Sequence, residues 1–175
     1  MRNLVLTVLL ALGLVVPATS AGAAPATEQF PSSGWRTAGV TWTNPAAPRP
    51  KVLDLRYAQH RRFDRVVIDV KGKIPGGHTA FRRHFTYDAS GERVPIRGGL
   101  ELVLKPAFTV DSNGVDVYEG PSMVRPGFPT LKAIALTGSF EGVVSFGFGL
   151  SPRRSPYRMF VLHQPQRLVI DFKHT

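Results

Sequence analysis

The stretch Arg65–Val70, with the sequence RVVIDV, recurs near the C-terminus as Arg167–Phe172, with the sequence RLVIDF. Four of the six positions are identical, and the other two exchange one apolar residue for another. Successive side chains of a β-strand point to opposite faces of a sheet, so one face of each copy carries Arg, Val and Asp while the other is wholly apolar. The apolar face must belong to a core, and both copies are therefore predicted to be strands.

Within one copy the Arg and the Asp lie four residues apart, about 13 Å along a strand, which is too far for a direct ion pair. Each would need a partner on a neighbouring strand. If the two copies pair antiparallel, Arg65 meets Asp171 and Arg167 meets Asp69. This arrangement is a hypothesis that follows from the repeat.

Further runs of strand length and apolar or alternating character fill the chain to its end. They cover residues 52–57, 63–70, 79–87, 100–104, 115–118, 131–136, 143–148, 157–162 and 168–172. Turn residues such as Pro75–Gly77 and Asn113–Gly114 lie between them. No stretch after the N-terminal leader carries the 3.6-residue apolar period of an amphipathic helix over three turns. The sequence predicts an all-β fold, a two-sheet β-sandwich or a partly closed barrel of about nine short strands.

The first 23 residues have the layout of a cleavable secretory signal peptide. Arg2 makes the N-terminus positive, residues 4–16 are apolar and uncharged, and Ala21 and Ala23 place small residues where a signal peptidase cuts. An apolar run of about 13 residues is too short to cross ~30 Å of hydrocarbon as a helix, which disfavours a membrane anchor. A lipid anchor would need a cysteine, and the sequence has none. We expect a secreted, extracytoplasmic protein with no stable membrane anchor.

Residues 24–50 are rich in Pro, Ala, Ser and Thr. Prolines at this density disfavour helix and ladder pairing, so this segment is predicted to be a linker or a loosely held arm. Trp35 and Trp42 would expose a large apolar surface to water if this segment were a free linker. We therefore expect the arm to dock on a β-domain formed by residues 51–175, with ligand stacking by the indoles as an alternative.

The chain is strongly basic, with 22 Lys and Arg against 12 Asp and Glu. Removal of Arg2 with the leader lowers the basic count to 21 and leaves a formal charge of +9. Such a balance favours an anionic partner. Because the protein is expected outside the cytoplasm, we expect an anionic wall polymer or peptidoglycan and no nucleic acid. A basic protein without a dedicated anionic partner is the alternative.

Motifs for catalysis and for metal binding are missing from the sequence. No serine lies in a Gly-x-Ser-x-Gly elbow, no cysteine is present, and the five histidines lack paired ligand spacing. The sequence thus predicts no catalytic residue, no metal site and no cofactor. Asp69, Glu141 and Asp171 are the conceivable carboxylates of an unrecognised hydrolase. We favour the interpretation that these carboxylates take part in strand pairing or in loop hydrogen bonds.

Three basic doublets are the best candidates for ligand binding. Arginine forks bind carboxylates and phosphates in a bidentate manner, and nearby aromatic rings can stack on sugars or guanidinium groups. Arg82 and Arg83 point to opposite faces of their strand, so at most one of them can join a shared patch. The predicted ligand-binding residues are Arg61, Arg62, Arg82, Arg153, Arg154 and Tyr157. A solvated basic surface without a common site is the alternative.

Several short motifs occur together, in order, from about Lys51 to the C-terminus. They are Phe63–Asp69, Gly91–Pro95, Phe140–Val144, Gly149–Leu150, Pro156–Arg158 and Pro165–Asp171. In this order they resemble the AMIN-like domain family of actinobacterial exported proteins, within the AMIN (amidase N-terminal) superfamily. The residues that form the structural signature in this resemblance are Asp64, Arg65, Asp69, Glu141, Arg167 and Asp171.

The resemblance implies two facing β-sheets and, from the classical AMIN domains, a non-catalytic role in holding envelope proteins at peptidoglycan. We therefore expect an exported, non-enzymatic β-domain that binds cell-wall or envelope material. An envelope protein–protein interaction module, recruiting a partner by strand addition to a sheet edge, is the alternative. An unrecognised wall hydrolase is the third possibility.

Overall fold

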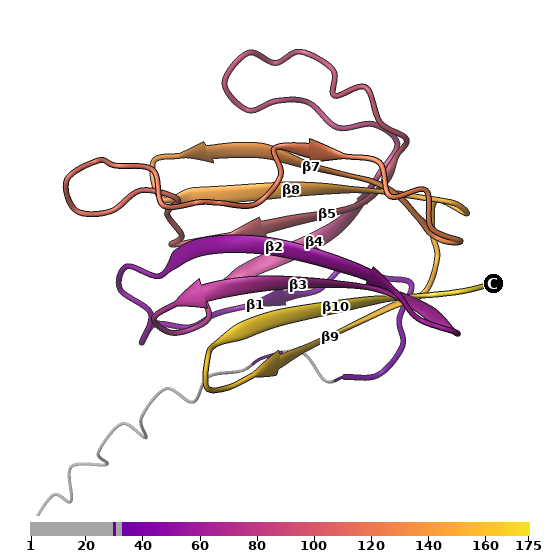
Figure 1. The fold of residues 1–175 in the computed structure, drawn as a ribbon, viewed down its shortest axis with the longest axis horizontal. Helices are drawn as coiled ribbons and strands as arrows, with labels where there is room; N and C mark the ends of the chain where they lie inside the picture. Colours follow the sequence, from indigo (N-terminus) through magenta and orange to yellow (C-terminus); the bar gives the residue numbers. More distant parts are fainter. Residues whose placement is uncertain (1–29, 31–32) are drawn as a thin grey trace, which may run out of the picture.

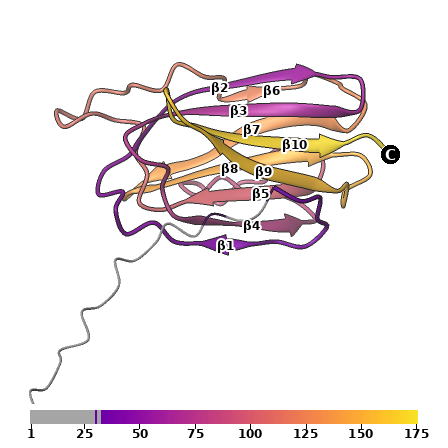
Figure 2. The same ribbon diagram turned by 90° about the horizontal axis from the view of Figure 1, so that it is seen from below.

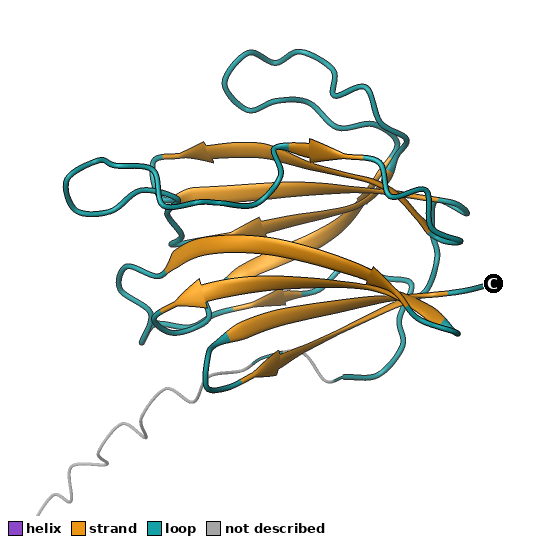
Figure 3. Cartoon of the chain, in the orientation of Figure 1, coloured by secondary structure: helices purple, strands orange, loops and turns teal. Residues whose placement is uncertain are grey.

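The computed structural model describes residue 30 and residues 33–175. The predicted signal peptide, residues 1–23, and the first part of the predicted arm lie outside the described residues. In the described part of the chain all regular structure is strand, and no helix forms (Figure 3).

Ten strands form two antiparallel sheets that face each other as a sandwich (Figure 1). The strands are β1 (Thr41–Trp42), β2 (Lys51–Gln59), β3 (Phe63–Lys71), β4 (Gly77–Arg82), β5 (Gly99–Leu104), β6 (Met123–Val124), β7 (Leu131–Phe140), β8 (Val143–Leu150), β9 (Tyr157–Leu162) and β10 (Arg167–Lys173). One sheet has the order β1-β4-β5-β8-β7-β6 and the other β2-β3-β10-β9. The sheets do not close into a barrel, so the predicted all-β sandwich is confirmed.

The two copies of the repeated pattern are β3 and β10, and they pair antiparallel at the centre of the four-stranded sheet. Their register places Arg65 opposite Asp171 and Arg167 opposite Asp69. The first of these pairs forms an ion pair, with Nε of Arg65 2.7 Å from Oδ1 of Asp171. The second does not, because Asp69 instead binds Arg56 of β2 and Nε of Arg167 donates to the carbonyl of Pro165. The pairing of the two copies is thus confirmed, with one of its two expected ion pairs.

The core lies between the sheets and is formed by the alternating apolar faces of their strands. From β3 and β10, the residues at the apolar positions of the repeat, Val66, Ile68, Val70, Leu168, Ile170 and Phe172, are all buried. Aromatic side chains cross the interface, since the rings of Phe148 in β8 and Phe172 in β10 lie 5.5 Å apart. The apolar face predicted from the repeat is therefore the inner face of the four-stranded sheet.

Residues 33–50 lie along the domain and add to both sheets (Figure 2). Trp42 is 4% exposed, and its indole Nε1 donates to the carbonyl of Pro75 at 2.8 Å. β1 pairs with β4 despite the prolines that follow it, because Thr41 and Trp42 themselves are free of proline. Arg36 forms a two-hydrogen-bond bridge to Tyr157 at the edge strand β9.

Two predicted strands differ from the structure. Residues 115–118 form only one isolated bridge, between Val110 and Asp116. There the Asp111 carboxylate accepts hydrogen bonds from the amides of Asn113 and Val115, and such local bonds compete with ladder pairing. The run 79–87 ends as a strand at Arg82, because the chain then leaves β5 and places the ring of Phe85 over Gly147 on the outer face of the six-stranded sheet.

Candidate functional site

The outer face of the four-stranded sheet carries a fully buried carboxylate shared by two arginines. Asp171 of β10 accepts hydrogen bonds from Arg65 of β3 and from Arg158 of β9, at donor–acceptor distances of 2.7–2.9 Å. Two guanidinium groups thus face one carboxylate and leave one positive charge in excess. The hydrogen bonds from Arg65 to Asp171 are the main cause of a raised pKa for Arg65. The side chains of Arg65 and Arg158 are 27% and 30% exposed, so both are accessible from the surface.

Aromatic rings enclose these two arginines. The guanidinium carbon of Arg158 lies 4.8 Å from the ring centroid of Trp35, and the rings of Phe63 and Phe160 contact both arginines within 6 Å. Such cation–π contacts hold a guanidinium in place while its N–H edge stays available. The cluster is therefore rigid and positively charged.

A pocket of about 310 Å³, called the basic pocket below, opens beside this cluster. It is lined by Trp35, Arg62, Phe63, Arg158 and Lys173. Three cationic side chains and two aromatic rings form its wall, and no carboxylate is among the lining residues. Such a combination suits an anionic group attached to a flat or apolar body.

Asp64 fixes two of the segments that carry the basic pocket. Its buried carboxylate accepts hydrogen bonds from the amides of Thr130 and Leu131 and lies 2.8 Å from Nε2 of His174. The amide of His174 in turn donates to the carbonyl of Arg62. Because Asp64 follows Phe63 and His174 follows Lys173, these hydrogen bonds set the positions of the pocket residues beside them.

The structure brings only one of the predicted ligand-binding residues into this pocket. Arg61 and Arg62 lie in the turn between β2 and β3, and Arg62 lines the pocket. Arg82 pairs with Glu101, and Arg154 lies over the ring of Phe81. Arg153 is exposed in the loop between β8 and β9.

Tyr157 occupies the core rather than the surface. It is fully buried, and its hydroxyl lies 2.6 Å from the hydroxyl of Thr79 and donates to the carbonyl of Ala38. Its hydroxyl partners are therefore the protein's own groups.

Sequence reasoning left out Arg158 and Lys173, which line the basic pocket, and considered Phe63 only as an aromatic neighbour of the Arg61–Arg62 doublet. Residues 63 and 65 share a face of β3, and residues 171 and 173 share a face of β10. Strand alternation could therefore have placed Phe63 and Lys173 on the same sheet face as Arg65 and Asp171. The position of Arg158 beside Asp171 depends on the pairing of β9 with β10, which no local pattern encodes. Trp35 was considered for ligand stacking, and it is 40% exposed in this pocket.

Two of the three carboxylates considered for hydrolysis form ion pairs within the domain. Asp171 is fully buried under two arginines, and Asp69 accepts hydrogen bonds from Arg56. Glu141 occupies a left-handed position, with φ of 48°, in the turn between β7 and β8. In the described part of the chain, no group of three or more His, Asp or Glu residues is arranged to hold a metal ion.

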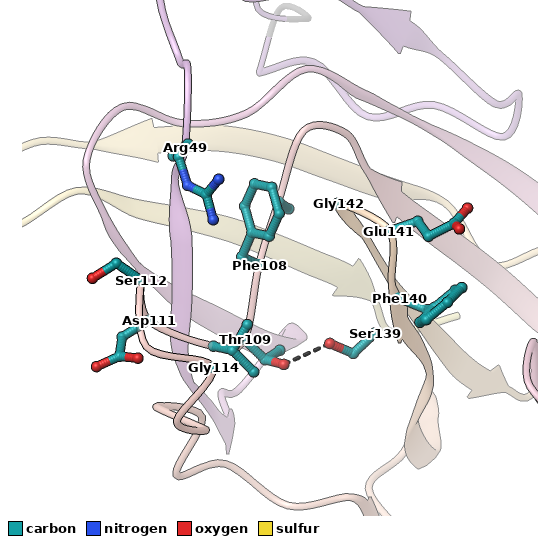
Figure 4. A pocket seen from close by; sticks show the side chains of 12 residues that line it. Arg49, Phe108, Thr109, Asp111, Ser112, Gly114, Ser139, Phe140, Glu141 and Gly142 are labelled. Atoms are coloured by element: carbon teal, nitrogen blue, oxygen red, sulfur yellow. Dashed lines mark hydrogen bonds between the residues drawn. The ribbon is translucent and has the colours of Figure 1, made fainter.

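A second hollow of about 460 Å³ lies at the tip of the β7–β8 hairpin (Figure 4). Phe108, Thr109, Asp111 and Ser112 lie on one side of it, and residues 139–142 on the other. The hydroxyls of Thr109 and Ser139 join the two sides at 2.5 Å. Arg49 lies over the ring of Phe108, 4.5 Å from its centroid.

A third hollow, of about 490 Å³, is acidic and lies beside β2. It is lined by Leu53, Asp54, Asp69, Asp116, Val117 and Glu119. Four of these six residues are carboxylates, and Arg56 pairs with two of them, Asp54 and Asp69, so the hollow keeps a net negative charge.

Comparison with known proteins gives one match. A family model described as "AMIN-like domain" matches residues 50–174, which covers β2–β10. No curated protein and no solved structure matches the chain. Within residues 30 and 33–175 there is no helix long and apolar enough to cross a membrane.

Proposed function

The chain belongs to the AMIN-like domain family, and from that premise we propose that it is an exported, non-catalytic domain that binds anionic cell-wall polymer or peptidoglycan. Domains of this family are generally non-catalytic binding domains associated with the envelope. The observation that carries the proposal is the basic pocket, in which Arg62, Arg158 and Lys173 surround an opening walled by Trp35 and Phe63.

The chemistry of the basic pocket fits a phosphate or a carboxylate that is attached to a sugar. The guanidinium groups bind such anions through two parallel N–H donors, and Lys173 adds a compact charge. The indole of Trp35 offers a flat apolar face for the body of the ligand. Asp171 neutralises only one of the two arginines that share it, so the pocket keeps a positive potential without a ligand.

Purified wall sacculi test the proposal in a sedimentation assay at low and at high salt. We expect retention of the wild-type protein at low salt and its release as salt screens the exposed charges. The double variant Arg62→Ala/Lys173→Ala should bind several-fold more weakly. The matched control is Arg153→Ala/Arg154→Ala, which removes the same net charge outside the pocket and should bind like the wild type.

Two results would contradict this assignment. Equal losses of affinity for sacculi in the two double variants would mean that net charge alone drives binding. If sacculi retained the wild-type protein at no salt concentration, the wall would be excluded as its ligand. Release of soluble sugar or peptide fragments from the sacculi would instead support a hydrolase.

A protein-interaction module is the second candidate, because β9 is an edge strand that the arm covers only in part. Arg36 bridges the backbone of Tyr157 at the start of β9, while β9 continues to Leu162. An extended peptide could add to the rest of this edge by backbone hydrogen bonds. A protein partner captured in place of sacculi, and lost on Val161→Pro, would favour this function.

A further inference from the structure

Phe140 is the most exposed large apolar side chain that the structure describes, with 73% of its surface accessible. It ends β7, directly before the turn formed by Glu141 and Gly142. Both turn residues have positive φ, 48° and 74°, as tight two-residue hairpin turns require. The short turn fixes the backbone at Phe140, so the ring is held in solvent by a rigid hairpin rather than by a loop that could fold over it.

Two hollows adjoin at Phe140. The hollow of Figure 4, about 460 Å³, lies on the side of Phe108, and a further hollow of about 500 Å³ lies on the side of Tyr87. Ser139 and Phe140 line both of them. The two hollows together are called the hairpin groove below. Each volume lies in the range of small-molecule sites.

Carboxylates are fixed on both sides of the hairpin groove. On one side, Oδ2 of Asp88 accepts a hydrogen bond from Ser145 at 2.7 Å and occupies the space above Gly138. On the other, Oδ1 of Asp111 accepts hydrogen bonds from the amides of Val115 and Asn113, and these lower the pKa of Asp111. Among the described residues, none donates from its side chain to the second oxygen of either carboxylate.

We propose that the hairpin groove binds a neutral polysaccharide, with Phe140 stacked between successive sugar rings. Aromatic rings offer flat apolar surfaces to the C–H faces of pyranose rings, and the groove has Tyr87, Phe140 and Phe108 along its length. The carboxylates of Asp88 and Asp111 accept hydrogen bonds from sugar hydroxyls, which neutral sugars supply in number.

The charges of the hairpin groove select against an anionic ligand. Its lining includes Asp88, Asp111 and Glu141 against the single cation Arg49, whose guanidinium is stacked on Phe108. The groove is thus chemically distinct from the basic pocket, and the proposal goes beyond the proposed function rather than depending on it. A protein interface is disfavoured because the cores of such interfaces are depleted of carboxylates, which here flank the exposed ring.

Titration with a soluble neutral glycan tests this assignment. The probes are the β-1,4-linked tetramers of N-acetylglucosamine and of glucose, added to the purified protein and followed by calorimetry and amide NMR. We expect saturable binding of at least one tetramer, little changed by 0.5 M salt because no charge is exchanged. Phe140→Ala should weaken it about tenfold, and the ring is exposed enough that its loss should leave the melting temperature unchanged.

Two further variants separate this site from the basic pocket. Asp88→Asn should also weaken binding of the tetramer, whereas Arg62→Ala/Lys173→Ala should leave binding of the tetramer unaltered while binding sacculi several-fold more weakly. Failure of both tetramers to bind, or equal affinity of the wild type and Phe140→Ala, would overturn the proposal. A purified protein partner that requires Phe140 while neither glycan binds would reassign the groove to protein recognition.

Discussion

Asp171 lies directly opposite Arg65 in the pairing of β10 with β3, and its fully buried carboxylate accepts hydrogen bonds from both Nε and Nη2 of that arginine. The equivalent positions of the other half of the repeat, Asp69 and Arg167, are also opposite each other but do not pair. Asp69 binds Arg56, whose side chain is 56% exposed. Asp171 and Asp69 occupy the same position in the two copies of the repeat but differ in burial. Their ion pairs should therefore contribute differently to the free energy of unfolding.

Asp171→Asn should lower the free energy of unfolding by about 2–4 kcal/mol, because it leaves two guanidinium groups without their shared charge. Asp69→Asn is the matched control and should cost less than about 1 kcal/mol, since exposed ion pairs contribute little. Urea denaturation of the two variants measures the difference. Equal losses would show that the burial of Asp171 has no consequence for stability.

Trp42→Ala should destabilise the protein by about 3–5 kcal/mol, because it removes a buried indole and its hydrogen bond to Pro75. Trp35→Ala should cost about 1 kcal/mol or less, since that ring is 40% exposed and its main contacts are to cations. The chain has two tryptophans, so fluorescence of each variant reports on the remaining one. A Trp42→Ala protein as stable as the wild type would show that the arm adds nothing to the core.

Stability should fall in alkaline solution because of two tyrosines. Burial raises the pKa of both Tyr157 and Tyr118 in the folded protein. The unfolded state then loses its tyrosine protons first, at a pKa of about 10, and the free energy of unfolding decreases as pH rises above that value. Each such tyrosine contributes a slope of about 1.4 kcal/mol per pH unit until its folded form also ionises.

Urea denaturation between pH 8 and pH 11.5 measures this dependence, and absorbance at 295 nm follows tyrosinate formation. Tyr157→Phe should be less stable at every pH, because Thr79 and Ala38 lose a partner, but its alkaline slope should be shallower. An unchanged slope in that variant would assign the alkaline loss to other groups.

Gly138→Ala should reduce both stability and glycan binding. A Cβ at this position would lie 1.8 Å from Oδ2 of Asp88, so the carboxylate would have to leave Ser145. Loss of the hydrogen bond between Asp88 and Ser145 costs about 1 kcal/mol. Gly34→Ala is the control, because nothing lies within 4 Å of its Cβ position, and its melting temperature should match the wild type.

Alternation of side chains was sufficient to predict the centre of the fold. In β3 and β10 every second residue is apolar, so the strands and their core face could be predicted from the repeat. The hypothesis that the two copies pair antiparallel gave the observed register. The prediction of residues 115–118 as a strand was wrong because aspartates at 111 and 116 bind the backbone locally, which an apolar pattern does not register.

The candidate site was less accessible to sequence reasoning, because it depends on which strands are neighbours. Arginine doublets suggested Arg62 but also Arg82 and Arg154, which contact Glu101 and Phe81 instead. Arg158 and Lys173 are single charges in apolar strands and reach the same pocket only because β9 pairs with β10. Local clustering of charge in a sequence is therefore a weaker indicator than position on a shared sheet face.

The central position of the β3–β10 pair also has a kinetic consequence. The partners Arg65 and Asp171 are 106 residues apart in the chain, so closing this pair requires a long loop. During synthesis the β2–β3 hairpin can form early, but its sheet stays two-stranded until β10 has left the ribosome. Folding of the four-stranded sheet should therefore be slow, and it should finish only once the C-terminal strands are available.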